Sequence, residues 1–260
     1  MSLNALKQLC TLKSSFGRAQ FIMRSLNGSP QIQNYHQEYA NIYSYINVGK
    51  EHTIAVTAHY DVSSEDSENC LDNSASVINL INLHNKLLAD RARLRYNVLI
   101  AFIDAEETTD FKLCGIYHLA HTFDVDQLID LELTAGGNEI LMSKYGDFDI
   151  FDYKTYRFPF NNAAVIDYWR QKHPDRIKCR GSACIVLASD EDIEELEATG
   201  MCRRFAHCHH PGDTVEKWAN MADMDKLVNT IYNHLVDPIV ESFKEKLNDV
   251  WLAPQRLLQH

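Results

Sequence analysis

A short stretch of the chain concentrates side chains that bind divalent metal ions. Residues 57–75 read TAHYDVSSEDSENCLDNSA and contain one imidazole, His59, and the carboxylates Asp61 and Asp72. Imidazole nitrogens and carboxylate oxygens are common zinc ligands in proteins. We therefore interpret this stretch as one half of a metal site. The alternative is that Asp72 only caps a helix and that His59 is an ordinary core histidine.

The elements around this stretch would place the three side chains. Residues 53–57 (TIAVT) are β-branched and apolar enough for a buried strand, and at strand periodicity His59 and Asp61 point to the same face. Asp61 would then orient His59. Asp72 comes just before an amphipathic helix predicted for Asn73–Leu88, and the dipole at a helix N-terminus favours an ionised carboxylate. A carboxylate held there, facing a histidine, can bridge two divalent ions.

Further acids and histidines lie at the ends of other predicted elements. The almost unbroken apolar run NVLIAFIDA is typical of a strand covered on both faces, and it ends directly in Glu106 and Glu107. Open α/β sheets place their sites at this end of their strands. A short strand predicted for residues 128–133 carries Glu132, and residues 206–214 (AHCHHPGDT) supply three histidines beside a turn.

The remaining pattern alternates strands and helices, which predicts an α/β fold. We expect one domain over residues 1–260, with a central mixed, mostly parallel sheet covered by helices on both faces. Further helices are predicted over residues 3–26 with a break at Ser14 and Ser15, Leu113–Phe123 and Asn161–His173, and further strands over Glu139–Tyr145 and Ala183–Ala188.

Two predictions concern the sheet edge and the end of the chain. Ile42–Val48 and His52–Asp61 are separated by Gly49 and Lys50, which predicts a hairpin at the edge of the sheet. A long helix is predicted from about Ala222 to Val250, with a kink at Pro238.

Composition and charge limit the partners. Thirty-six acidic residues against 25 basic ones give a net charge of −11, which argues against nucleic acid as a partner. The longest apolar runs are far too short to cross a membrane, and no signal segment is evident over Leu3–Leu12. Seven scattered cysteines fit a reducing compartment, so we expect a cytoplasmic protein. No oligomeric state follows from the sequence.

Other clusters carry weaker signals. The run DEDIEELE at residues 190–197, after the N-cap candidate Ser189, is interpreted as a solvated helix end, or alternatively as an acidic rim that attracts an amine to the site. A serine hydrolase is not supported, because GxSxG is absent. The cysteine clusters that come nearest to a structural zinc site lack the usual short spacing. They are Cys202 and Cys208 with His210, and Cys179 with Cys184.

Five segments taken in order resemble the M28 family of dizinc aminopeptidases. AHYD looks like the family's histidine-bearing strand end, LDNSASVINLINL like its DNxSG-type segment and helix, and FIDAEE like its strand ending in paired glutamates. DLEL looks like its NLDM-type strand, and HHPGDT like its HTPxDT segment. The matches span roughly residues 40 to 235, and five ordered motifs are far more specific than one. The resemblance implies a zinc-exopeptidase-like fold.

Carried over residue by residue, the resemblance implies two zinc ions per chain. Asp72 would bridge them. One zinc would be bound by Glu107 and His209, and the other by His59 and Glu132.

The resemblance also assigns the two remaining acids of the set. Glu106, next to a ligand but not itself bound, would be the general base that takes a proton from water and passes it to the leaving amine. Asp61 would be the partner that orients His59.

Two departures leave points open. His209 is chosen because the family ligand lies four residues before the position of Asp213, but His207 or His210 remains an alternative. Glu132 stands where aspartate is commoner, and the extra methylene can shift the second metal.

The resemblance implies a hydrolase that removes an N-terminal residue from a peptide or small amide. A glutaminyl-cyclase-like enzyme or another amide hydrolase of the same fold is the first alternative. A non-catalytic binding or scaffold domain is the second, because fold alone does not establish catalysis.

Overall fold

The computed structural model describes residues 2–64, 66–108, 110–158, 161–200 and 202–238, and its central feature is an eight-stranded sheet. The strands are β1 (Gln31–Asn34), β2 (Ala40–Ile46), β3 (Thr53–His59), β4 (Asn97–Ile103), β5 (Gln127–Leu131), β6 (Glu139–Gly146), β7 (Lys154–Thr155) and β8 (Gly181–Ala188). The α-helices are α1 (Leu3–Thr11), α2 (Ser15–Ser25), α3 (Ala75–Ala89), α4 (Gly115–Thr122), α5 (Asn162–Lys172), α6 (Asp190–Thr199), α7 (Val215–Trp218) and α8 (Met221–Leu235).

The sheet is mixed and mostly parallel, as predicted. Its strand order is β1-β2-β4-β3-β5-β8-β6-β7, and the four central strands β4, β3, β5 and β8 run parallel to one another. Strands β2 and β6 flank them as antiparallel neighbours. The carboxyl ends of the central strands therefore lie at one edge of the sheet.

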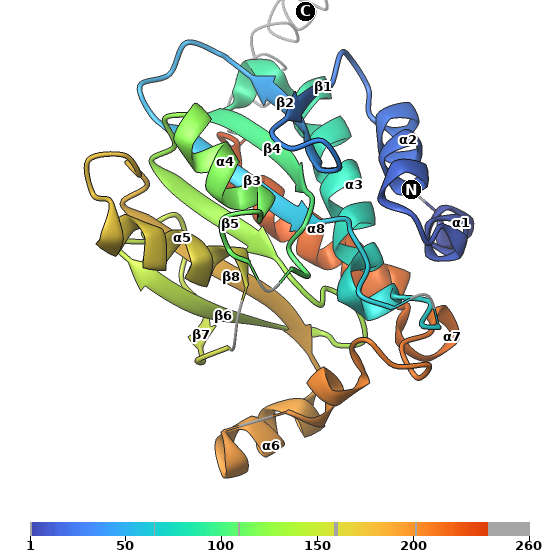
Figure 1. The fold of residues 1–260 in the computed structure, drawn as a ribbon. Coiled ribbons are helices and arrows are strands. Elements are labelled where there is room, and N and C mark those ends of the chain that lie inside the picture. The colour runs from blue at the N-terminus through green and yellow to red at the C-terminus, as the bar shows by residue number, and fades with distance from the viewer. Residues whose placement is uncertain (1, 65, 109, 159–160, 201, 239–260) are drawn as a thin grey trace, which may run out of the picture.

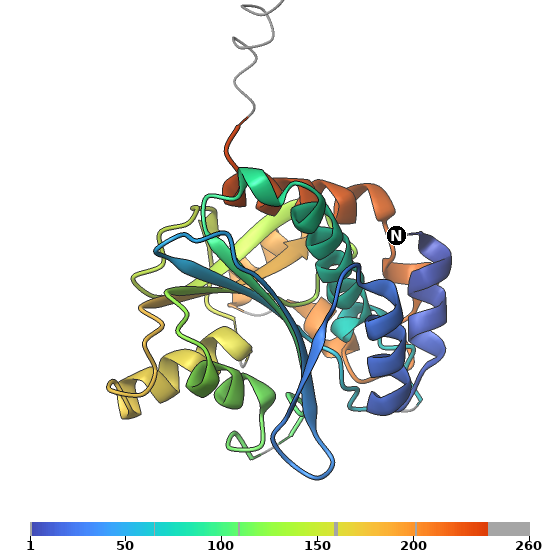
Figure 2. The same cartoon turned by 90° about the horizontal axis from the view of Figure 1, so that it is seen from above.

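Helices cover both faces of the sheet, which Figures 1 and 2 show from two directions. Helices α1, α2, α3 and α8 pack on one face, and α4 and α5 on the other. Strand β4 contributes alternate side chains to the two cores, with Phe102 in the first and Ile103 in the second, both fully buried. The sequence prediction of a strand covered on both faces is confirmed.

Local capping explains where the predicted helices begin. Ser14 precedes α2, and its side chain accepts a hydrogen bond from Gly17 N at 3.2 Å, so the break predicted there separates α1 from α2. Ser189 and Asp192 form a capping box at the start of α6. Gly200 ends α6 with φ of 74°, a conformation that glycine adopts without a steric penalty.

The predicted hairpin of β2 and β3 is wrong. Strand β4 lies between them, antiparallel to β2 and parallel to β3. Strand β3 is buried along its whole length and pairs on its other side with β5, so it is a central strand. A strand whose two faces are both covered is more stable between two partner strands, which pair its backbone hydrogen-bonding groups on both sides, than in the outermost position of the sheet.

The predicted closing helix is too long. Helix α8 ends at Leu235; Val236 is extended and bridges to Leu94 instead of continuing the helix. Pro238 disfavours helical geometry in the residue before it, which favours this early end. The rest of the predicted helix, residues 239–250, lies outside the described residues. None of the helices in the described part of the chain is long and apolar enough to span a bilayer.

Candidate metal centre

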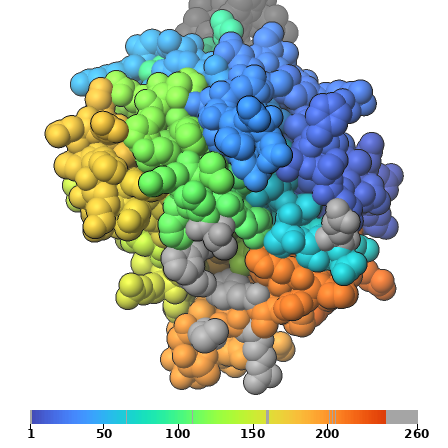
Figure 3. Space-filling view, viewed as in Figure 1, coloured from blue at the N-terminus to red at the C-terminus, as the bar shows by residue number. Residues whose placement is uncertain are grey.

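Three neighbouring strands deliver acidic or imidazole side chains to the same edge of the sheet. His59 is the last residue of β3, Glu106 and Glu107 follow β4, and Glu132 follows β5. Because β4, β3 and β5 are parallel neighbours, the side chains that follow them converge. On the face shown in Figure 3, the segments that follow β3, β4 and α6 lie next to one another.

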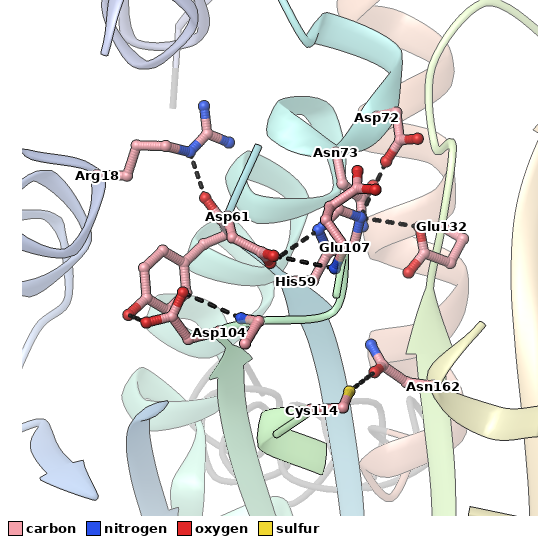
Figure 4. A network of polar contacts seen from close by, with 12 residues as sticks. Arg18, His59, Asp61, Asp72, Asn73, Asp104, Glu107, Cys114, Glu132 and Asn162 are labelled. Carbon is pink, nitrogen blue, oxygen red and sulfur yellow. Dashed lines mark hydrogen bonds and ion pairs between the residues drawn. The ribbon is translucent and has the colours of Figure 1, made fainter. Parts of the chain in front are cut away.

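Asp72 lies at the centre of the cluster, between two histidines. It belongs to a π-helical turn, Cys70–Ser74, that leads into α3. Its Oδ1 lies 2.9 Å from His59 Nε2, and its Oδ2 lies 3.0 Å from His209 Nε2. The two oxygens of one carboxylate therefore face two different imidazoles (Figure 4 shows the His59 side).

Two groups of three side chains share Asp72. His59, Asp72 and Glu132 form one group, and Asp72, Glu107 and His209 form the other; within each, one ligand atom per residue lies within 4.8 Å of the others. His59 Nε2 is 3.5 Å from Glu132 Oε2, and His209 Nε2 is 3.1 Å from Glu107 Oε1. These are the two ligand sets that the sequence resemblance implies. A third group joins His59, Glu107 and Glu106.

Asp61 contacts two members of the cluster from behind. Its Oδ1 lies 3.3 Å from His59 Nδ1, and its Oδ2 accepts the backbone N–H of Glu107 at 3.0 Å. The contact with His59 is the one predicted from strand periodicity, and it leaves Nε2 of the ring facing Asp72 (Figure 4). The contact with Glu107 was not predicted.

Two further residues hold the turn that carries Asp72. Asp213, fully buried, accepts the backbone N–H of Leu71 at 2.5 Å and that of Asp72 at 3.1 Å. Asn73, joined to Asp72 by a cis peptide bond, donates from Nδ2 to the Leu131 carbonyl at 3.0 Å. The sequence pattern gives no sign of either role, because Asp213 and Asn73 contact backbone groups that lie far away in the chain.

The backbone adopts a positive φ at three positions in or next to the candidate site. Ala105 (φ 56°) precedes the glutamate pair, Leu133 (φ 52°) follows Glu132, and His209 itself has φ of 66°. Non-glycine residues rarely adopt this left-handed region, and where they do they often mark functional sites.

The cluster is rich in negative charge, and all of its members except His209 are largely buried. Burial, together with the charges of Asp130 and Asp72 and against the attraction of His59, raises the pKa of Glu132 to about 8. Burial also raises the pKa of Glu106 well above its ordinary value. The Asp72 and Glu107 carboxylates raise the pKa of His209 to about 10. The shifts of the two glutamates reflect carboxylates crowded where water cannot stabilise them, and that of the half-exposed His209 reflects its two carboxylate partners.

This donor set fits divalent cations. Among the residues that the structure describes, Glu132 Oε1 is buried without a hydrogen-bond partner, and Glu107 Oε1, although close to His209, forms no hydrogen bond of acceptable geometry. Unsatisfied buried carboxylate oxygens are costly unless a cation neutralises them. Mixed imidazole and carboxylate ligands suit zinc.

The competing assignments do not converge in the same way. His207 packs against Trp218 and approaches Lys217, whereas His209 is the histidine that reaches Asp72 and Glu107. Among the described residues, none of the three candidate groups contains a cysteine. Four acids of α6 line a separate pocket and not the cavity at the metal cluster: Glu191, Asp192, Glu194 and Glu195.

A cavity of about 500 Å³ opens onto the cluster. Its floor is formed by the cluster residues, and its walls are largely apolar. The apolar lining residues are Phe111, Leu133, Phe158, Val165, Val186, Cys184 and Cys208. The histidines His59 and His209 are the only basic side chains among the described lining residues.

The family follows from these motifs in sequence. Residues 41–231 match the model of peptidase family M28. The chain belongs to this family. The match includes all the candidate ligands and leaves out α1, α2 and β1. No curated protein matches this M28 chain in sequence.

Solved structures with the same fold include two kinds of enzyme. The Legionella pneumophila aminopeptidase LapA aligns at 13% identity and a TM-score of 0.66 over 89% of this chain and 69% of its own. A Bacteroides thetaiotaomicron glutaminyl cyclase bound to N-acetylhistamine aligns at 13% identity and a TM-score of 0.66 over 91% and 97%. BSAP, a zinc aminopeptidase from Bacillus subtilis, aligns at 14% identity and a TM-score of 0.54 over 75% and 49%. At these identities the likeness concerns the fold.

Proposed function

We propose that this M28 chain is a dizinc aminopeptidase that removes apolar residues from the N-termini of peptides. The observation that carries the proposal is the position of Asp72, whose two oxygens face His59 and His209 separately. One zinc would be held by His59, Asp72 and Glu132, and the other by Asp72, Glu107 and His209. A site for a single ion has no need of the first group.

The bound ions would supply the electrophile: a zinc pair polarises a scissile carbonyl and lowers the pKa of water. Glu106 would act as the general base beside them. Its carboxylate lies in one group with His59 and Glu107, and burial raises its pKa, which makes it a stronger proton acceptor that can return the proton to the leaving amine. Such a base typically contributes about 10² to 10⁴ in rate.

The cavity supports an apolar side chain at the cleaved residue. Phe111, Phe158 and Val165 line it, and burial of apolar surface against them favours a substrate with a similar side chain. Acidic side chains are disfavoured, because the described lining contains no lysine or arginine to pair with them. The same lack of a cation argues against a subsite for a C-terminal carboxylate.

The decisive experiment combines metal analysis with a substrate panel. Protein purified without chelator should contain about two zinc ions per chain and should hydrolyse leucyl and phenylalanyl chromogenic amides faster than alanyl or glutamyl ones. Removal of zinc should abolish hydrolysis and its return should restore it. Retention of about one zinc, or hydrolysis that is independent of metal, would contradict the dizinc proposal.

A glutaminyl cyclase is the second candidate, favoured by one observation. The Bacteroides enzyme of that activity shares the fold over 97% of its own length, so the fold is compatible with a cyclase as well. Peptides with an N-terminal glutamine distinguish the two activities. Cyclisation releases ammonia and leaves the peptide bond intact, whereas an aminopeptidase releases free glutamine.

A non-catalytic scaffold is tested by the same samples. A scaffold would neither retain zinc nor recover it after dialysis against zinc, and it would turn over none of the amides. The complete set of candidate ligands in one cluster supports the enzyme.

A further inference from the structure

Arg18 is a buried arginine of α2 that contacts both chain segments carrying the central ligands. Its side chain is fully buried. Nε donates a hydrogen bond to the carbonyl of Tyr60, the residue after His59, and Nη2 donates to Ser74 Oγ at 3.0 Å, two residues after Asp72. Figure 4 shows Arg18 reaching the end of β3 from the side opposite Glu132.

A third hydrogen bond ties the same guanidinium to α1. Nη1 donates to the Leu9 carbonyl at 3.4 Å. Each of the three nitrogens therefore binds a different segment: α1, the end of β3, and the turn before α3. The planar arginine fork can hold three acceptors in fixed directions, and the ammonium of a lysine, a point charge on a flexible stem, cannot.

The charge of Arg18 is costly where it lies. Among the described residues Arg18 forms no ion pair, and its hydrogen bonds go to neutral oxygens. Burial lowers the pKa of Arg18 to about 10, and the charges of Cys10, Asp61 and Asp72 oppose that fall, so the side chain stays charged at neutral pH. A residue that only filled this space would avoid the cost by being apolar.

Arg18 also lies outside the part of the chain that defines the family. The match with peptidase family M28 begins at residue 41, whereas Arg18 belongs to the helical pair α1 and α2 that precedes it. The family pattern therefore assigns it no role.

We propose that Arg18 is a positioning residue of the metal centre. By holding the Tyr60 carbonyl and the Ser74 hydroxyl at once, it sets the separation of His59 and Asp72. These two ligands would bind one zinc together with Glu132. The inference rests on the proposed function, because it concerns how that zinc is held. It gives the helical pair α1 and α2 a part in metal binding, although neither helix supplies a ligand.

Charge and position make opposite predictions for this residue. Loss of the Arg18 charge near Asp61 and Asp72 would by itself strengthen zinc binding, because less positive charge would repel the ion. Loss of the fork would let the two ligands drift apart and weaken binding. Arg18→Met removes both the charge and the fork, and Arg18→Lys keeps the charge without the fork.

The test measures zinc affinity without using activity. Metal-free wild type, Arg18→Lys, Arg18→Met and the control Arg24→Met, which changes an exposed arginine of the same helix, are titrated with zinc against a chromophoric chelator. Two stepwise constants are expected for the wild type and the control. In both Arg18 variants we expect one of the two steps to lose about 10- to 100-fold in affinity, with a smaller change in the other step.

Circular dichroism of the metal-free proteins establishes that each variant is folded. If Arg18→Met does not fold, Arg18→Lys and Ser74→Ala, which removes one acceptor of the fork, carry the test and should both weaken the same step. Wild-type affinity in the folded Arg18 variants, or tighter binding in Arg18→Met, would overturn the positioning role. A wild type that binds no zinc would instead overturn the proposed function itself.

Discussion

The Asp213 carboxylate accepts the backbone N–H of Asp72 at 3.1 Å and that of the preceding Leu71 at 2.5 Å. Asp213 is fully buried, and these two bonds fix the backbone of the turn from which the Asp72 side chain projects. The segment that supplies His209 therefore also orients the central carboxylate. Two members of the second candidate zinc group, Asp72 and His209, therefore depend on this segment.

Asp213→Asn should weaken zinc binding by about 10- to 100-fold, because an asparagine can accept only one of the two N–H groups and turns an N–H₂ toward the other. The free energy of unfolding should fall by about 1–3 kcal/mol, since a buried donor is left without a partner. Chelator competition and denaturant unfolding measure the two effects. Asp225→Asn, an exposed change in α8, is the control and should alter neither. Unchanged zinc affinity in a folded Asp213→Asn would contradict the orienting role.

Glu106→Gln should separate catalysis from metal binding. The amide cannot accept the proton, so we expect kcat to fall by about 10² to 10⁴ while two zinc ions are retained. Glu107→Gln, the matched neighbour, should instead lose zinc, because its side chain belongs to the group with Asp72 and His209. Metal analysis beside steady-state kinetics on a leucyl amide checks both. If Glu106→Gln kept full activity, the base would have to be another residue.

His59, the Glu106–Glu107 pair and Glu132 could be proposed as candidates because each lies at the end of a strand with a strong local pattern, whereas Asp72 rested on a helix start and His209 on the family resemblance. The strand carrying His59, the apolar strand before Glu106 and Glu107, and the strand before Glu132 all show short-range periodicity that survives folding. The parallel arrangement then brings their carboxyl ends together.

The unpredicted features depend on contacts between distant parts of the chain. Strands β2 and β3 are consecutive in the sequence and look like a hairpin, because consecutive strands usually pair. In the sheet β4 lies between them, because β3 needs partners on both sides. Arg18 carries a charged side chain of a type that is mostly exposed, and its burial arises only when α2 packs against Tyr60 and Ser74.

Val165→Phe should shift the choice of substrate. Val165 lies in α5 with its side chain at the cavity wall, so a larger side chain there reduces the space for the substrate's own. We expect kcat/KM for a phenylalanyl amide to fall by roughly tenfold or more relative to an alanyl amide. Tyr168→Phe, an exposed change in the same helix, should leave the ratio unchanged. An equal loss on both amides would show that Val165 does not shape the pocket.

Ionised Asp192 should stabilise the fold, so that the protein becomes less stable when acid protonates this side chain. Its Oδ2 accepts from Ser189 N at 2.8 Å and lies 3.4 Å from Nε of the buried Arg204, and its Oδ1 accepts from Cys202 Sγ at 3.0 Å. Burial raises the pKa of Asp192, but these contacts outweigh burial and hold the pKa below its ordinary value of 3.8. The folded pKa is the lower one, so the contribution to stability is present above pH 3.8 and is lost as the pH falls through the folded value.

Asp192→Asn removes that contribution at every pH. At pH 7 we expect its free energy of unfolding to lie about 1–3 kcal/mol below that of the wild type, because the buried Arg204 loses its charged partner. The difference should shrink as the pH falls below 3.8, where the wild-type carboxyl is protonated as well. Denaturant unfolding of the metal-free proteins at a series of pH values measures it, with the exposed change Glu194→Gln as control. A difference independent of pH would mean that the side chain acts by its shape and not by its charge.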